Sequence, residues 1–253
     1  MQLNTCTNKS NRLPNVLKNL SINNQSITII GNHCEEKSIK FLGVHLDENL
    51  TWQAHINYIS KKISQSLFAI HRVKHILPTS SLKSLYYALI HSHLSYAIQV
   101  WGNSNFLYKL ITRQKRALRA ISKKPYLSHT EPLFKHNKIL KLEDLYCLQV
   151  TIFMYDLHTN VLPSSFNSMK KERSNYSIVT RQTNSLYMPT DRARTDYSSK
   201  LPKHQFPKLW NENDDIVKKA KSRTIAKKSI TNNILKNYKV NVTCRNANCR
   251  YCN

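Results

Sequence analysis

Three cysteines near the C-terminus have the spacing of a metal site. Cys244, Cys249 and Cys252 form a Cys-x4-Cys-x2-Cys pattern, with Arg245 and Arg250 between them. Three thiolates so close together suit a tetrahedral zinc ion that takes its fourth ligand from elsewhere. Because no histidine follows them, two interpretations stay open: a zinc site, and a disordered basic tail that binds no metal.

Two acidic pairs have residue types that could serve phosphoryl transfer through bound metal ions. Asp214 and Asp215 are adjacent, but no strand pattern surrounds them. We expect them to begin a helix, where acidic side chains interact favourably with the helix dipole. Asp47 and Glu48 follow a predicted strand, and we expect them to end it as turn residues. Neither pair predicts catalysis.

The remaining histidines and cysteines favour structural roles. His71 and His75 have the spacing of a helical metal pair, but no carboxylate or cysteine accompanies them. Packing or solvent exposure is therefore the expected role of both. Cys6, Cys34 and Cys147 each stand alone, and we expect free or buried thiols.

Positive charge is the strongest chemical signal in the chain. The net charge is +25, and residues 49–130 contain no Asp or Glu at all, against twelve Lys and Arg. Solvated helix faces normally mix charges, because like charges one turn apart repel. An acid-free basic face is typical of contact with the phosphates of nucleic acids. The expected contacts are Lys109, Arg113, Arg116, Arg119, Lys123 and Lys124, with Lys61, Lys62, Arg72 and Lys74 in support.

Composition excludes several other classes of protein. The three glycines, at positions 31, 43 and 102, are too far apart for a phosphate-binding loop. No apolar run approaches the roughly 20 residues that span a bilayer, and the first residues lack the pattern of a secretory signal. We therefore expect an intracellular protein, nuclear or cytoplasmic, that is neither secreted nor bound to a membrane.

Hydrophobic periodicity predicts an α+β protein that is mainly α. Residues 20–29 and 39–46 alternate, which predicts a hairpin and a third strand in one small antiparallel sheet. Apolar steps of three and four predict helices over about 56–77, 79–97, 107–121, 142–158 and 215–237. Thr51 is expected to cap the first helix. Residues 164–205 lack a period and predict a partly ordered loop.

Several short motifs, in series, resemble one family. Residues 41–52 read Phe-Leu-Gly-Val-His-Leu-Asp-Glu-Asn-Leu-Thr-Trp. This string resembles the Leu-Gly-Val strand that leads from the catalytic palm into the helical thumb in reverse transcriptases of jockey-like non-LTR retrotransposons. Gln-Lys-Arg-Ala at 114–117 and Pro-Lys-Leu-Trp-Asn at 207–211 are similar to later motifs of the group. One departure is Phe206, where the family usually has glycine, so we expect a strained or missing turn there.

The resemblance implies four parts of the chain. They are an end-of-palm β remnant at 1–48, a helical thumb at 49–125, a basic helical C-terminal region at 126–240 and the cysteine tail at 241–253. The parent enzyme would be an RNA-directed DNA polymerase that uses Mg²⁺. Its Asp pair would lie upstream of the Leu-Gly strand, so we expect this chain alone to have no cofactor and no polymerase or endonuclease activity.

The implied partners are RNA and DNA, gripped by the backbone with little regard for sequence. Two alternatives stay open. One is a basic protein-interaction or structural module in which residues 218–223, Lys-Lys-Ala-Lys-Ser-Arg, act as a nuclear import patch. The other is the non-functional product of a truncated element.

Overall fold

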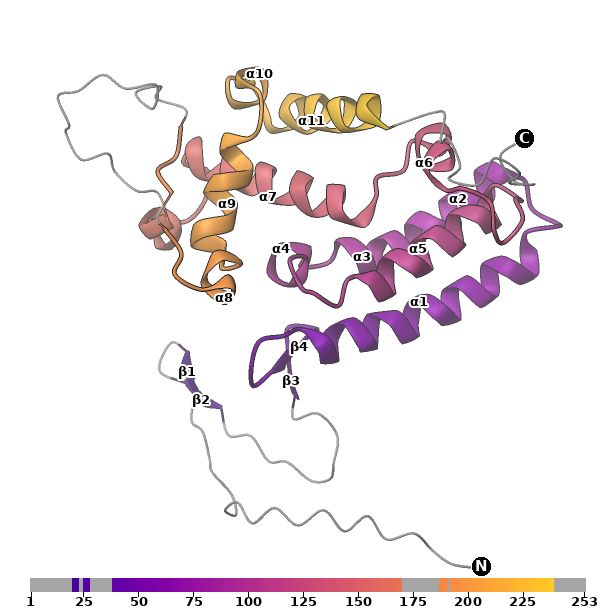
Figure 1. Ribbon diagram of the computed structural model, residues 1–253, viewed down its shortest axis with the longest axis horizontal. Coiled ribbons are helices and arrows are strands. Elements are labelled where there is room, and N and C mark those ends of the chain that lie inside the picture. The colour runs from indigo at the N-terminus through magenta and orange to yellow at the C-terminus, as the bar shows by residue number, and fades with distance from the viewer. Residues whose placement is uncertain (1–19, 23–24, 28–37, 170–186, 191, 239–253) are drawn as a thin grey trace, which may run out of the picture.

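Helices dominate the computed structural model (Figure 1), which describes residues 20–22, 25–27, 38–169, 187–190 and 192–238. The prediction of an α+β, mainly α protein is confirmed. In the described ranges we find no helix of the length and apolarity that crossing a bilayer requires. The predicted zinc ligands Cys244, Cys249 and Cys252 lie outside the described residues.

The described strands form two separate hairpins, so the prediction of one three-stranded sheet was wrong. β1 (Leu20–Ile22) pairs with β2 (Gln25–Ile27), and β3 (Ser38–Phe41) pairs with β4 (Val44–Asp47). The alternation over residues 39–46 predicted one continuous strand, but the structure has a tight turn in the middle of this segment. Leu42 and Gly43 both have positive φ, 45° and 81°, as the favoured two-residue hairpin turn requires. Tyr96 holds this turn by donating its hydroxyl to the Leu42 carbonyl at 2.6 Å.

Asp47 organises the connection from β4 to the first helix. Its carboxylate accepts hydrogen bonds from the Thr51 N–H at 2.7 Å, the Thr51 hydroxyl at 2.5 Å and the Trp52 N–H at 2.8 Å. Burial alone would raise the pKa of Asp47, but these hydrogen bonds outweigh it and hold the pKa below its ordinary value. The predicted N-cap was wrong by one residue, since Trp52 occupies that position at φ 66°. Thr51 Oγ1 accepts only a long bond of 3.4 Å from the Gln53 N–H.

The first helices form a bundle. α1 (Gln53–Val73) ends four residues before the predicted position, and α2 (Thr79–Tyr86) continues through a π-turn, η1 (Tyr87–His91), into α3 (Ser92–Ser95). The predicted helix over 79–97 is thus present but irregular. Ala97, at φ 51°, breaks the chain before α4 (Ile98–Trp101). α5 (Tyr108–Ile121) runs alongside α1 (Figure 1).

The second half of the chain packs on this bundle mainly through one long helix, α7 (Leu142–His158). α7 has nearly the predicted bounds, and α6 (Glu131–Asn137) precedes it without having been predicted. The predicted loop contains the 3₁₀ turn η2 (Ser164–Met169) and α8 (Asp196–Ser199), and α9 (Pro202–Asn211) begins inside it. The segment predicted as the last helix forms two helices, α10 (Asp215–Lys218) and α11 (Arg223–Asn237).

Phe206 lies within α9 and not in a turn, so the expected strain at this position was wrong. Its side chain is buried and packs edge-to-face on Phe153 of α7, with ring centroids 5.6 Å apart. Pro207 also lies inside the helix. A large apolar side chain suits this position because it joins α9 to the core.

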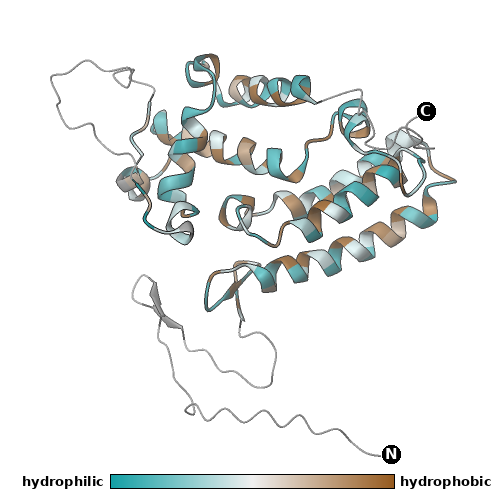
Figure 2. Cartoon of the chain, viewed as in Figure 1, coloured by the Kyte–Doolittle hydropathy of each residue, from teal (hydrophilic) through white to brown (hydrophobic). Residues whose placement is uncertain are grey.

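A single cluster of buried side chains extends from Ile56 to Tyr238. Trp101 and Trp210 are fully buried in it. In Figure 2, hydrophobic and hydrophilic residues alternate in bands along the helices, as expected of amphipathic elements that surround a shared core. The predicted division of the chain at residue 125 stays a prediction.

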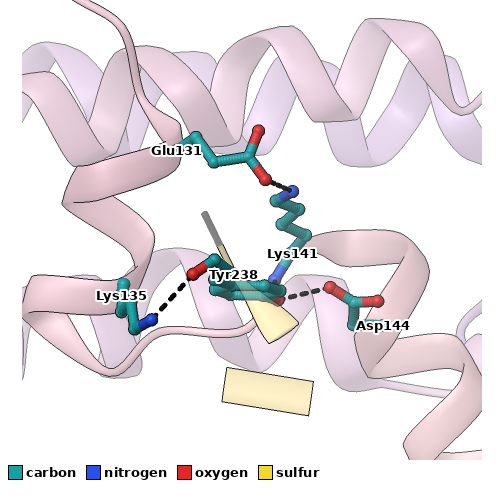
Figure 3. A network of polar contacts seen from close by, with 5 residues as sticks. All are labelled: Glu131, Lys135, Lys141, Asp144 and Tyr238. Atoms are coloured by element: carbon teal, nitrogen blue, oxygen red, sulfur yellow. Dashed lines mark hydrogen bonds and ion pairs between the residues drawn. The ribbon is translucent and has the colours of Figure 1, made fainter. Parts of the chain in front are cut away.

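Polar contacts at the end of α11 hold the C-terminal region against α6 and α7 (Figure 3). Tyr238 donates its hydroxyl to Asp144, and its backbone carbonyl accepts from Lys135 Nζ at 2.8 Å. Lys141 Nζ lies 4.7 Å from the centre of the Tyr238 ring and pairs with Glu131 at 2.6 Å. Two basic side chains are therefore engaged in joining the helices here.

Candidate nucleic-acid interface

Two of the predicted contacts join α5 to α1. Lys109 Nζ donates to Asn57 Oδ1 at 2.7 Å, and one turn later Arg113 Nε donates to Ser60 Oγ. Both cationic side chains are half-buried. Since α1 and α5 run in the same direction along this seam, the two hydrogen bonds fix the register of the helices. Lys109 and Arg113 therefore have a structural role, because their side chains already join the two helices.

The next turn of α5 builds a cluster around an aromatic ring. Arg116 Nη2 donates to the Tyr126 hydroxyl at 3.0 Å, and Arg119 Nε donates to the Ser128 carbonyl at 2.8 Å. Their guanidinium carbons lie 5.5 Å and 5.9 Å from the centre of the Tyr126 ring. Among the described atoms, Arg116 Nε is buried and has no hydrogen-bond partner. Burial lowers the pKa of Arg119, and Tyr126 opposes that shift.

The remaining predicted contacts are more accessible. Lys61 and Lys62 are exposed on α1, and Lys123 and Lys124 are exposed just after α5. Lys123 adopts φ 53°, and the Lys124 N–H bonds back to the Arg119 carbonyl at 3.0 Å, which is the usual geometry of a helix C-terminus.

Two predicted supporting residues lie at the far end of α1. Arg72 is exposed, with its guanidinium carbon 5.0 Å from the centre of the Phe68 ring, and Lys74 is half-buried directly after the helix. The structure thus divides the predicted set. Lys61, Lys62, Arg72, Lys123 and Lys124 are exposed, whereas Lys74, Lys109, Arg113, Arg116 and Arg119 are half-buried.

Negative charge gathers in a different part of the molecule. A cavity of about 300 Å³ between α7, α9 and α11 is lined by Asp144, Glu212 and Asp214, with Cys147 among its other residues. Desolvation and the nearby carboxylates raise the pKa of Cys147 to about 11, so its thiol stays protonated and unreactive at neutral pH. Acidic side chains repel phosphate, so this cavity is not suited to binding a polyanion.

The other residues with potential chemistry have structural positions. Asp214 precedes α10 and accepts from Asn233 at 3.2 Å, and Asp215 lies 3.8 Å from Lys218. The pair begins a helix, as the sequence predicted. His71 and His75 are both exposed at the end of α1. Across the described ranges, no three His, Cys, Asp or Glu residues are grouped so as to hold a metal ion.

Sequence reasoning missed Tyr126, Asn57 and Ser60. The polar partners carry no signal in a single sequence, because Asn and Ser on a helix are ordinarily solvent-facing. Tyr126 follows the Lys-Lys-Pro break at 123–125, and an aromatic residue directly after basic residues was an available signal.

No protein-family model, curated protein or solved structure matches this chain.

Proposed function

We propose that this chain is the thumb and C-terminal region of a non-LTR retrotransposon reverse transcriptase and grips nucleic acid by its backbone. The observation that carries the proposal is the exposure of Lys61, Lys62, Lys123 and Lys124 on a bundle that has no acidic residue from 49 to 130. RNA and DNA are the proposed partners. An intracellular location, nuclear or cytoplasmic, is part of the same proposal.

Electrostatics supports a contact that does not depend on sequence. Lysine ammonium groups act as point charges that contact phosphates without reading base edges. Each neutralised phosphate releases counterions, so affinity should fall steeply as salt rises. The half-buried Lys109 and Arg113 contribute to the positive electrostatic field around the bundle. The exposed lysines contact the phosphates.

A variant with alanine at Lys61, Lys62, Lys123 and Lys124 should bind duplexes more weakly than wild type. The loss of affinity should be about the same for duplexes of unrelated sequence. The slope of log K against log salt should flatten by about 0.9 for each phosphate that the variant no longer neutralises. Fluorescence anisotropy over a salt series measures both quantities.

A matched variant replaces Lys203, Lys208, Lys219 and Lys221 by alanine. It removes the same charge from exposed positions outside the bundle, so its slope should change little. Equal losses of affinity in the two variants would contradict the proposal, because they would show that total charge and not the α1–α5 surface governs binding. That outcome would favour the alternative of a basic structural or interaction module.

We also propose that this chain alone does not polymerise, although a parent enzyme would use Mg²⁺. The adjacent carboxylates Asp214 and Asp215 support this, because they are engaged at the start of α10 and lie far from the basic bundle surface in sequence. Primer extension on an RNA template with Mg²⁺ should give no incorporation above a control without protein. Incorporation that depends on the protein would sink this part of the proposal.

A further inference from the structure

We propose that Tyr126 is a stacking platform for an unpaired base, so that the end of α5 binds single-stranded nucleic acid or the frayed end of a strand. This inference rests on the proposed function and deepens it, because it names the form of nucleic acid that one part of the surface prefers. Backbone contacts alone would not distinguish paired from unpaired strands in this way.

Two arginines contact the Tyr126 ring. Arg116 and Arg119 both come from α5 and lie one turn apart, with their guanidinium carbons 5.5 Å and 5.9 Å from the centre of the ring. The residue is nevertheless 63% exposed. The ring is therefore accessible to a ligand although two arginine side chains contact it.

The support is specific and reduces the motion of the ring. Arg116 bonds the hydroxyl at 3.0 Å, Arg119 is itself fixed by the Ser128 carbonyl, and Pro125 restricts the backbone directly before the tyrosine. A side chain ordered before binding loses less entropy on binding. The Tyr126 side chain is therefore ordered before a ligand binds.

Cationic groups for the flanking phosphates lie close to the ring in sequence. Lys123 and Lys124 are exposed three and two residues before Tyr126. Aromatic rings interleaved with positive charge are the arrangement that binds single strands with little sequence preference. Bases inside a duplex are already stacked and cannot reach such a ring.

Tyr126→Ala should weaken binding to a labelled oligothymidine about tenfold, the order of magnitude expected for loss of one stacked base. Binding to a duplex with the same number of phosphates should change less than about twofold, and the salt slope should stay the same because no charge is removed. Tyr126→Phe keeps the ring and should bind the single strand within about threefold of wild type. Anisotropy titrations measure all of these.

Tyr108→Ala is the matched control, because Tyr108 is 59% exposed at the other end of α5. It should leave single-strand binding within about twofold of wild type. A fluorescent 2-aminopurine in the strand gives a second readout, since its emission should be quenched by wild type and by Tyr126→Phe but not by Tyr126→Ala. Circular dichroism confirms folding, and Tyr126→Leu replaces the alanine variant if that variant unfolds.

The failures of the two proposals are distinguishable. Wild-type binding that Tyr126→Ala leaves unchanged on single strands, or weakens equally on duplex, overturns the stacking role alone. No binding of wild type to either form overturns the proposed function, and the stacking role with it.

Discussion

Replacing Gln114 by leucine should lower the free energy of unfolding by about 3–5 kcal/mol, because each buried polar group left without a partner costs about 1–3 kcal/mol. Gln114 lies on the core side of α5 and is 1% exposed. Leucine would fill much of the same volume and recover some apolar burial, but it offers no hydrogen bond. The loss falls on three partners at once.

Each polar atom of the Gln114 side chain is satisfied. Nε2 donates to the Tyr86 hydroxyl at 3.0 Å and to the Leu140 carbonyl at 2.9 Å, while Oε1 accepts from the Leu142 N–H at 3.0 Å. Leu142 begins α7, and the first N–H groups of a helix have no partner within it. One amide therefore joins α2, α5 and the start of α7 in the interior of the protein.

Urea unfolding followed by circular dichroism measures this loss. Gln65→Leu is the control, because Gln65 is exposed on α1 and the same substitution there should change stability by no more than about 0.5 kcal/mol. A Gln114→Leu protein as stable as the control would show that the three hydrogen bonds contribute nothing net to folding.

The elements that could be predicted from sequence are those whose signal lies within one element. α7 was placed almost to the residue, because apolar residues recur at steps of three and four along its whole length. The turn at Leu42 and Gly43 was missed because a leucine at positive φ is unusual, and the structure stabilises it through Tyr96, far away in sequence. The breaks after Ser95 and after Lys218 were missed as well.

The sequence predicted the charge of the candidate surface, but not which side chains are exposed on it. The absence of acids from 49 to 130 can be read directly from the chain. The chain does not reveal which cations are exposed. Helical spacing places Lys109 and Arg113 on the same face as Arg116. It does not show that Asn57 and Ser60 of α1 lie opposite the first two. Side-chain partners from another helix thus convert predicted ligand contacts into cross-links.

Stability should fall as the pH drops from about 6.5 to 4, and His55 should account for a large part of the loss. His55 is 1% exposed at the start of α1, and its Nδ1 accepts the His45 N–H at 3.3 Å. The neutral ring must then carry its proton on Nε2. Trp101 packs edge-to-face with the His55 ring, with centroids 5.6 Å apart.

Burial, and secondarily the charge of a protonated His45, lowers the pKa of His55 from 6.5 to about 4. Protonation at Nδ1 would remove the acceptor that holds β4 on α1, and it would place a charge among apolar side chains. Because the unfolded chain binds this proton first, the stabilisation is complete above pH 6.5. It is lost progressively as the pH falls to about 4, at up to about 1.4 kcal/mol per pH unit. We expect a total of about 2 kcal/mol.

His55→Gln supplies an acceptor that does not titrate, so its free energy of unfolding should depend less on pH between 6.5 and 4 than that of wild type. Burial also lowers the pKa of His45 and His91, and partial desolvation lowers that of the exposed His71, so some dependence should remain. His75→Gln makes the same substitution at an exposed position at the end of α1 and serves as the matched control. Urea unfolding at intervals of half a pH unit compares the three proteins. Parallel curves for wild type and His55→Gln would mean that another group drives the loss, and that the contact between β4 and α1 does not depend on the charge of His55.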